Sequence, residues 1–293
     1  MGSRDSRLLV KSGDSGQAGT LVDISSAQAG WEHLNMRVTR LHAGMMLEGD
    51  TGTREEAHVI LGGQCRIETS HATYGRVGRR AHVFDGMPWA LFMSPGTKYQ
   101  IIALTDQVEI AACMVEATEF FPERLVTPDD VKIELRGGEN ASRQINGILP
   151  PGFPCQRIVA VEVYAPSGNW SSYPPHKHDV HRVDASGALI EADLEEFYFY
   201  KFDRPEGYAY QRLYTDDRSL DELVLAGHHD TVLIPKGYHP VVTAHGYTSY
   251  YLNFLAGSAQ SLANTDDPAY AHIKDTWRVK DPRLPIVSHE MEG

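Results

Sequence analysis

The fold is decided by one stretch, Gly168-Asn-Trp-Ser-Ser-Tyr-Pro-Pro-His-Lys-His-Asp179. It carries His176 and His178, and residues two apart on an extended strand point to the same face. Two imidazoles on one face, behind the rigid pair Pro174-Pro175, form a two-pronged clamp for a metal ion. Taken alone, this pattern favours a surface strand with incidental histidines. The prediction of a metal site therefore depends on the residues downstream.

Two further candidate ligands follow in patterns typical of strands. The run Leu194-Glu-Glu-Phe-Tyr-Phe-Tyr200 alternates, so Glu196, Tyr198 and Tyr200 share one face. An apolar strand, a Pro-x-Gly turn and a histidine make up the run Val232-Leu-Ile-Pro-Lys-Gly-Tyr-His239. Mixed nitrogen and oxygen ligands suit Zn, Mn, Fe or Ni.

Each of these two ligands has a rival. The long insertion over 179–195 leaves the choice between Glu195 and Glu196 open. We favour Glu196 because its face also carries two tyrosines, which suit a polar cavity, whereas the other register would place phenylalanines beside the metal. His245 shares strand parity with His239, but only His239 directly follows the Pro-x-Gly turn.

These motifs resemble the two sequence motifs of the cupin barrel, and at family level they resemble 5-deoxy-glucuronate isomerase, an enzyme of inositol breakdown. The similar runs are 169–179, Glu196-Phe-Tyr-Phe-Tyr-Lys-Phe202, Pro235-Lys-Gly-Tyr-His-Pro240, Ser142-Arg-Gln-Ile-Asn146 and Tyr250-Tyr-Leu-Asn-Phe254. The resemblance runs from about the Arg54-Glu55 region to Gly257. It implies an all-β bicupin fold, with two small antiparallel barrels in tandem and few helices.

The resemblance also implies a cofactor and a reaction. One divalent metal per chain, Zn or Mn, would be held by His176, His178, Glu196 and His239. The reaction would be a metal-dependent aldose–ketose isomerisation of 5-deoxy-D-glucuronate to 5-dehydro-2-deoxy-D-gluconate. The alternatives are the related 5-keto-4-deoxyuronate ketol-isomerase of pectin breakdown, a cupin dioxygenase and a non-catalytic sugar-binding bicupin. The first of these has a shorter His-to-Glu gap than this chain.

Such a reaction needs a base that moves a proton between neighbouring carbons. The candidates by residue type and expected face are Glu162, Tyr198, Tyr200 and Tyr210. Two arginines are candidates for binding the carboxylate of a uronic acid, because guanidinium binds carboxylate bidentately. They are Arg143, in the joining region, and Arg212, on the Tyr210 face of its strand. Arg143 could equally serve at the surface or in an interdomain ion pair.

The first half of the chain predicts a second barrel of the same kind. Short apolar runs separated by turns recur from Met36 to about Glu116, which is typical of an all-β barrel. We expect a metal-free cupin barrel with a loose lead-in over 1–125, and a joining segment, the metal-binding barrel and a tail over 126–293. In the first barrel Tyr99 stands near the place of the Pro-x-Gly histidine. The spacing of a metal site is not recreated by His58, His71 and His82.

Composition narrows the class of partner. The formal net charge of −12 argues against nucleic acid and anionic membrane, so we expect a small uronic acid as the ligand. No apolar run approaches the about 18 residues of a membrane span. The three cysteines are widely spaced, which predicts buried reduced thiols in a cytoplasmic protein. We also expect a homo-oligomer, and a short helix at Asp267–Trp277 in a tail without chemistry.

Overall fold

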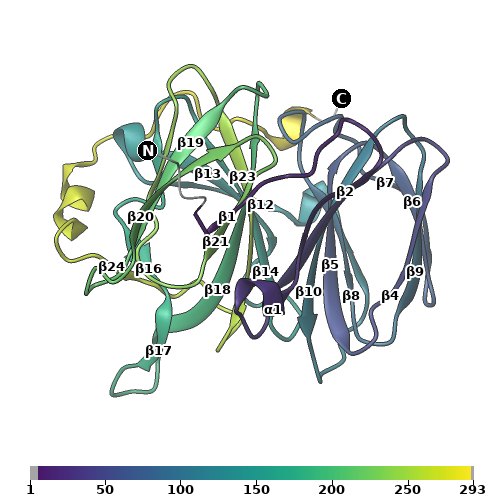
Figure 1. The fold of residues 1–293 in the computed structure, drawn as a ribbon, viewed down its shortest axis with the longest axis horizontal. Helices are drawn as coiled ribbons and strands as arrows, with labels where there is room; N and C mark the ends of the chain where they lie inside the picture. The colour runs from purple at the N-terminus through teal and green to yellow at the C-terminus, as the bar shows by residue number, and fades with distance from the viewer. Residues whose placement is uncertain (1–5, 292–293) are drawn as a thin grey trace. The chain divides into compact units, whose positions relative to one another are not determined.

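A computed structural model describes residues 6–291, and its chain forms two compact units. One unit, here called the N-terminal barrel, contains residues 12–132, 147–160 and 287–291. The other, the C-terminal barrel, contains residues 6–11, 133–146 and 161–286. The units therefore differ from the expected division at residue 125, because the first described residues join the C-terminal barrel. Figure 1 shows that strands dominate both.

The N-terminal barrel has two antiparallel sheets. Their orders are β11-β8-β5-β10-β3-β2 and β4-β9-β6-β7. The strands are β2 (Gly19–Ile24), β3 (Asn35–Leu41), β4 (Met46–Asp50), β5 (Arg54–Gly62), β6 (Cys65–Thr69), β7 (Thr73–Val77), β8 (Trp89–Met93), β9 (Lys98–Ala103), β10 (Val108–Glu116) and β11 (Arg124–Val126). Side chains such as Ile60, Leu91 and Ile101 pack into one apolar cluster between them. Burial of this apolar surface holds the barrel together.

The C-terminal barrel contributes the larger sheet, in the order β1-β21-β18-β23-β14-β13-β12, with β17 paired to β18. A second sheet has the order β15-β22-β19-β20, and β16 pairs with β24. The strands are β1 (Leu9–Val10), β12 (Lys132–Arg136), β13 (Arg143–Leu149), β14 (Val159–Ala165), β15 (Trp170–Ser171), β16 (His176–Lys177), β17 (Asp179–Val183), β18 (Leu189–Phe202), β19 (Tyr208–Tyr214), β20 (Asp221–Gly227), β21 (Thr231–Ile234), β22 (Val241–Thr243), β23 (Ser249–Gly257) and β24 (Thr265–Asp266).

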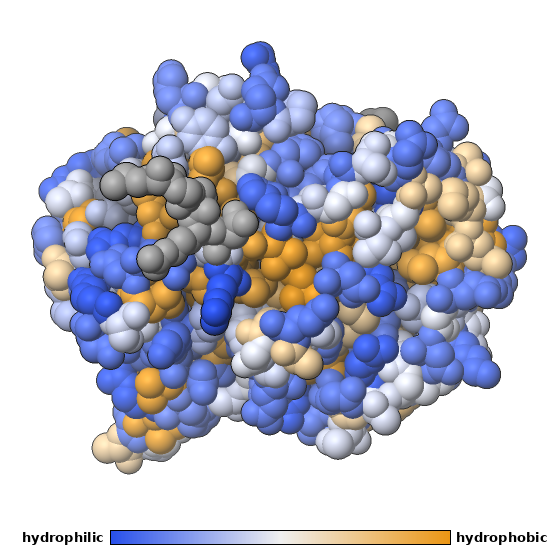
Figure 2. Space-filling view, in the orientation of Figure 1, coloured by the Kyte–Doolittle hydropathy of each residue, from blue (hydrophilic) through white to orange (hydrophobic). Residues whose placement is uncertain are grey.

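The long strand β18 is central to this barrel. It pairs with β21 on one edge and β23 on the other, which sets Glu196 opposite Ile234 and Leu255. The start of β18 pairs with β17 and forms the expected hairpin between the histidine motif and the glutamate. Figure 2 shows apolar surface on this projecting hairpin, where Val180 and Val183 are exposed.

Helices are short and few. They are α1 (Ser26–Ala29), η1 (Pro128–Asp130), η2 (Glu139–Ala141), η3 (Ala271–Thr276) and η4 (His289–Met291), all but α1 being 3₁₀ turns. The helix expected at Asp267–Trp277 is thus the shorter turn η3. Within residues 6–291 no helix has the length and apolar content needed to cross a membrane. All three cysteines are buried free thiols, as predicted.

Candidate metal centre

Three separate elements bring the predicted ligands together. His176 lies on β16 and His178 directly follows it, while Glu196 lies in the middle of β18. His239 follows β21 after a turn at Gly237, which adopts a φ of +85°. A Cβ atom on Gly237 would lie 2.5 Å from the carbonyl oxygen of Tyr214, so this turn requires glycine.

The ligand atoms of His178, Glu196 and His239 all lie within 4.8 Å of one another. The Nε2 atoms of His178 and His239 are 3.0 Å and 3.4 Å from the same oxygen, Oε2 of Glu196. His176 stands beside this group, with its ring centroid 4.8 Å from that of His239. The rival His245 is exposed and is not part of the group.

Hydrogen bonds to the backbone orient both imidazoles. Nδ1 of His178 donates to the carbonyl of Leu194 at 3.0 Å, and Nδ1 of His239 donates to the carbonyl of Gly237 at 2.9 Å. These bonds leave the Nε2 lone pairs facing one carboxylate oxygen, which is repulsive unless a cation or a proton lies between them. Nε2 of His239 is buried and has no hydrogen-bond partner. The donor set and its orientation therefore fit a divalent cation.

The electrostatic environment favours neutral imidazoles at two of the three histidines. Burial lowers the pKa of His239 to about 3 and, with the neighbouring histidines, holds the pKa of His176 well below its usual value. Burial also lowers the pKa of His178, but the hydrogen bond and charge of Glu196 outweigh it and the net shift is upward. Burial raises the pKa of Glu196. Neutral imidazole is the form that binds metals.

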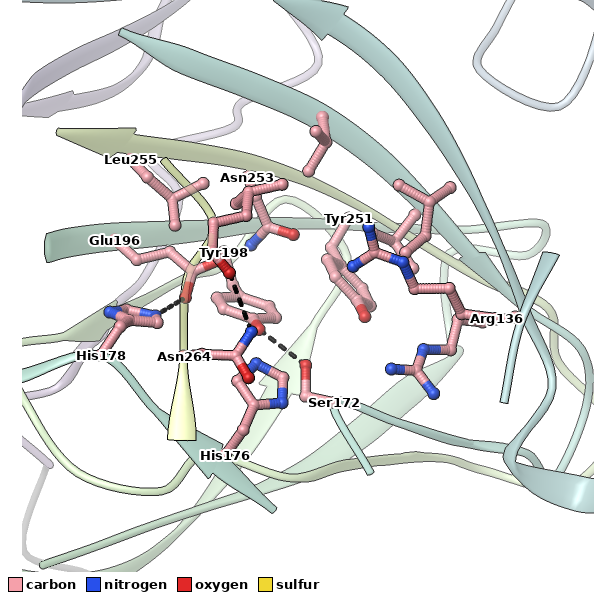
Figure 3. A pocket seen from close by; sticks show the side chains of 15 residues that line it. Arg136, Ser172, His176, His178, Glu196, Tyr198, Tyr251, Asn253, Leu255 and Asn264 are labelled. Atoms are coloured by element: carbon pink, nitrogen blue, oxygen red, sulfur yellow. Dashed lines mark hydrogen bonds and ion pairs between the residues drawn. The ribbon is translucent and has the colours of Figure 1, made fainter. Parts of the chain in front are cut away.

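A cavity of about 60 Å³ opens beside these ligands. Figure 3 shows His178, Glu196 and Tyr198 on one side of it and Arg136 on the other. The polar residues of its wall are Arg136, Arg143, Ser172, Tyr198, Tyr251, Asn253 and Asn264. The apolar residues are Ile145, Val161, Val163, Leu255 and Leu262. A small polar molecule could thus reach the ligand group between hydroxyl, amide and guanidinium groups.

Two tyrosine–serine contacts lie in the wall. Oη of Tyr198 is 2.8 Å from Oγ of Ser172, and Tyr251 shares a short hydrogen bond with Ser171. Ser172 has a φ of +48°, a left-handed conformation that is uncommon for a residue other than glycine and that occurs at functional sites. Burial raises the pKa of Tyr251 to about 12 and that of Tyr198 well above its usual value. Both phenols are therefore hydrogen-bond donors at neutral pH.

Arg143 reaches the cavity from β13 and is only 8% exposed. Its Nη1 donates to the carbonyl oxygens of Ala141 and Tyr173 at 3.2 Å and 3.0 Å. Among the described residues no carboxylate forms an ion pair with it, and burial lowers its pKa. A buried charge without a partner is costly, so this guanidinium is available to an anionic ligand.

Three of the sequence-based site candidates lie outside the cavity. Glu162 points to the opposite face of β14 from the lining residues Val161 and Val163, and accepts a hydrogen bond from Oη of Tyr250 at 2.9 Å. Tyr210 and Arg212 lie on the outer face of β19, where Arg212 pairs with Asp221. The inner face of β19 carries Gln211 instead. The structure thus does not bring these three residues to the cavity beside the ligand group, because alternation separates the faces of a strand without telling which face meets the cavity.

Tyr200 occupies an intermediate position. It is buried, and its hydroxyl donates to Oε1 of Gln211 at 2.9 Å. Its ring stacks 6.1 Å from that of Tyr198, but it is not among the residues that line the cavity. It therefore supports Tyr198 from behind.

Sequence reasoning missed several residues of the wall. Tyr251, Asn253 and Leu255 alternate along β23, so a period-two pattern could have found them. Asn264 and Arg136 stand in segments with no such signal, since β24 has only two residues and β12 five.

The N-terminal barrel contains a partial counterpart of this group. Nε2 of His58 is 2.8 Å from Oε2 of Glu56, two residues away on β5. The ring of Tyr99 lies edge-on to that of His58, with 4.8 Å between the ring centroids. Tyr99 is the residue that the sequence placed near the position of the Pro-x-Gly histidine. A Cβ atom on Gly49 would lie 2.2 Å from the Tyr99 ring, so Gly49 makes room for it. Burial and Glu56 raise the pKa of Tyr99 above its usual range.

The chain is similar to known proteins along most of its length. The model of the KduI/IolB family matches residues 8–273. A protein of Geobacillus thermodenitrificans (strain NG80-2) named 5-deoxy-glucuronate isomerase is 38% identical over 272 residues, covering 92% of this chain and 97% of the relative. A Bacillus subtilis (strain 168) protein of the same name is 34% identical over 253 residues, covering 86% and 91%.

Solved structures agree on the fold. The crystal structure of an IolB-like protein from Salmonella typhimurium LT2 matches with a TM-score of 0.86 and 34% identity, covering 92% of this chain and 99% of that one. Oxalate decarboxylase from Bacillus subtilis matches with a TM-score of 0.59 and 12% identity, covering 90% and 80%. That protein is described as having Mn(II) centres. At this identity the likeness concerns the fold alone, which is bicupin.

Proposed function

The chain belongs to the KduI/IolB family, and from this premise we propose that it is a metal-dependent isomerase that converts 5-deoxy-D-glucuronate to 5-dehydro-2-deoxy-D-gluconate in inositol breakdown. The observation that carries the proposal is the meeting of two features in one cavity. These are a group of ligands suited to a divalent cation and a buried guanidinium without a carboxylate partner. A uronate offers both a carbonyl beside a hydroxyl and a carboxylate.

His176, His178, Glu196 and His239 would hold the cation, for which we propose Zn or Mn. Such an ion would supply Lewis-acid stabilisation of the negative charge that develops on the sugar oxygens. In this proposal Arg143 binds the carboxylate of the substrate and fixes the orientation of the sugar. The apolar residues Val161 and Leu255 line the same cavity and offer contact surface to the carbon skeleton of the sugar.

The hydroxyl groups of the cavity would donate hydrogen bonds to the oxygens of the sugar. Oη of Tyr198 donates its one proton to a sugar oxygen and accepts a hydrogen bond from the hydroxyl of Ser172. Because burial raises the pKa of Tyr198, its phenol stays protonated at neutral pH, so it can donate a hydrogen bond but does not act as a base. Tyr198 is therefore proposed as a proton donor, and the base that acts on carbon is assigned to no residue.

Assay of the metal-loaded protein with two uronates tests the proposal. We expect conversion of 5-deoxy-D-glucuronate, in air and under nitrogen alike, and slower or no conversion of 5-keto-4-deoxyuronate. NMR of the product formed in D₂O shows whether solvent deuterium enters carbon, as transfer through an exchanging base requires. Failure of fully metallated protein to convert the first uronate would reject the assignment, and dependence on oxygen would favour a dioxygenase.

The setting of the reaction is also a proposal. Buried free thiols at Cys65, Cys113 and Cys155 support a reducing, cytoplasmic environment. We propose a homo-oligomer acting on a small uronic acid without nucleic-acid or membrane partners, in keeping with the net charge of −12. Analytical ultracentrifugation would test the assembly.

A further inference from the structure

A second, wider cavity adjoins the candidate site. It has a volume of about 380 Å³ and shares four lining residues with the smaller cavity, so the two lie side by side. The shared residues are Arg136, Arg143, His176 and Asn264. We call the wider cavity the vestibule. Arg136 and His176 thus both face the vestibule as well as the smaller cavity beside the metal ligands.

The C-terminal arm, residues 264–280, makes one wall of the vestibule. It contributes Asn264, Asp266, Lys274, Trp277 and Lys280. The vestibule as a whole is lined by four cationic side chains and two acidic ones, although the protein has a net charge of −12. A local excess of positive charge in an acidic protein favours the entry of anions.

One of the two acidic groups, Glu134, occupies a particular position. It stands two residues before Arg136 on β12 and holds that guanidinium bidentately, with Nε to Oε1 at 2.6 Å and Nη2 to Oε2 at 2.8 Å. This is the geometry in which arginine binds the carboxylate of a ligand. Both side chains are partly exposed, 39% for Arg136 and 56% for Glu134, so the pair is weak and easily exchanged.

The charges around Glu134 extend toward the inner cavity. Its pKa is lowered first by the hydrogen bond from Arg136 and further by the charges of Arg136, Arg143 and Lys280. Glu134 thus stands in a field of cations that includes the unpaired guanidinium of Arg143. A carboxylate that reached the same place would meet the same cations.

We propose that Glu134 acts as a substitute for the substrate carboxylate at the entrance of the site. The carboxylate of an incoming uronate displaces Glu134 from Arg136 and then passes inward to Arg143, which has no carboxylate partner of its own. Arg136 is the first recognition residue in this scheme, Arg143 is the second, and Glu134 lowers affinity by competing for Arg136. The inference deepens the proposed function and rests on it for the identity of the substrate class.

Binding measurements test this without turnover. Isothermal titration calorimetry of the metal-loaded protein would use D-glucuronate as the anionic probe and D-glucose as its neutral counterpart. We expect Glu134→Gln to lower the Kd of D-glucuronate by about threefold to tenfold, because the competing charge is gone. Arg136→Met should raise that Kd about tenfold and Arg143→Met more, whereas the response to D-glucose should not change with any of the three.

The double variant Glu134→Gln with Arg136→Met tests whether Glu134 competes with the ligand for Arg136 or acts only through its contribution to the net charge. If Glu134 acts through Arg136, the gain from Glu134→Gln disappears in the Arg136→Met background. A gain of equal size in both backgrounds would overturn the proposal, as would unchanged or weaker binding of D-glucuronate by Glu134→Gln alone.

A matched surface pair provides the control. Arg37 and Asp23 in the N-terminal barrel form an ion pair at 3.0 Å with exposures of 46% and 52%, close to those of Arg136 and Glu134. Asp23→Asn should leave the Kd of D-glucuronate unchanged, and a gain like that of Glu134→Gln would show that net charge alone is responsible. Because binding is measured apart from catalysis, loss of isomerase activity would reject the proposed function without deciding this inference.

Discussion

Each barrel contains a buried arginine, and the two arginines have different hydrogen-bond partners. In the N-terminal barrel, the buried guanidinium of Arg40 is paired with two carboxylates, those of Asp14 and Glu109. In the C-terminal barrel, the buried guanidinium of Arg143 meets carbonyl oxygens and no carboxylate. The first arrangement brings together oppositely charged groups of the chain itself, and we propose that an anionic ligand completes the second.

The histidine–glutamate contacts repeat this contrast. Glu56 and His58 stand two residues apart on one strand and form a hydrogen bond with each other, and the ring of Tyr99 packs edge-on against His58. His178 and Glu196 come from different strands, and His239 approaches the same oxygen with an unpartnered nitrogen. The comparison teaches that a metal site needs side chains from several segments whose ligand atoms meet at one point. A histidine and a glutamate that are near neighbours in sequence can instead simply form a hydrogen bond with each other.

Removing ligands should produce the largest difference between the barrels. His178→Ala and Glu196→Ala each take away one member of the group, and we expect loss of the metal and about 10⁴-fold lower isomerase activity. His58→Ala should retain one metal per chain, measured by elemental analysis after gel filtration. The contrast fails if the His58 variant loses metal, or if both C-terminal variants keep it in full.

Removing the two arginines should affect stability in one barrel and activity in the other. Arg40→Met removes the guanidinium that pairs with the buried carboxylate of Glu109, so we expect the free energy of unfolding to fall by about 3–5 kcal/mol. Arg143→Met leaves two carbonyl oxygens without this donor but no buried carboxylate, so it should cost less, about 1–2 kcal/mol, while kcat/KM falls about 100-fold. Urea unfolding and steady-state kinetics on the same preparations measure both. Equal destabilisation by the two substitutions would contradict the contrast.

A smaller effect is expected at Glu56. Glu56→Leu deprives His58 of its partner at Nε2, although its Nδ1 already lacks one, and should cost about 1–3 kcal/mol. Isomerase activity per folded molecule should stay at the wild-type level, because Glu56 belongs to the N-terminal barrel. Thermal unfolding monitored by circular dichroism would measure the loss of stability. A lower kcat in the folded variant would refute the expectation that activity is unchanged.

The smallest effect concerns alkaline pH. Burial raises the pKa of Tyr251 to about 12, above the value of about 10 for an unfolded phenol. A raised pKa stabilises the folded protein fully below pH 10, and this contribution is lost as the pH rises from 10 toward 12. The free energy of unfolding should therefore fall less steeply over this window in Tyr251→Phe than in wild type. Parallel slopes in urea titrations would show that Tyr251 ionises as easily in the folded chain.

The local patterns predicted the candidate ligands for a physical reason. The spacing of His176 and His178 and the turn before His239 are set by the backbone itself, so they can be recognised without knowing the rest of the barrel. The same is true of the alternation that favoured Glu196 over Glu195. The bicupin fold was implied by the resemblance of these motifs to a known family, while the recurring short strands alone predicted only an all-β barrel.

The remaining errors come from long-range packing. Glu162 and Tyr210 were assigned to the correct strands, but which face of a strand meets the cavity is decided by the neighbouring strands. Arg136 and the C-terminal arm were missed because their roles come from where the chain passes and not from a periodic pattern. Lys274 and Trp277 stand in a 3₁₀ turn and just after it, in a segment whose sequence carries no motif.

The pairing of β1 with β21 has a consequence for synthesis on the ribosome. Leu9 and Val10 are synthesised more than 200 residues before Val232 and Thr231, the residues with which they pair. At ordinary translation rates this interval lasts about 10–45 s. Until then β1 has no partner, because β21, the strand that leads to His239, has not yet been made. The nascent chain must therefore keep β1 from pairing with other strands while the whole N-terminal barrel is made.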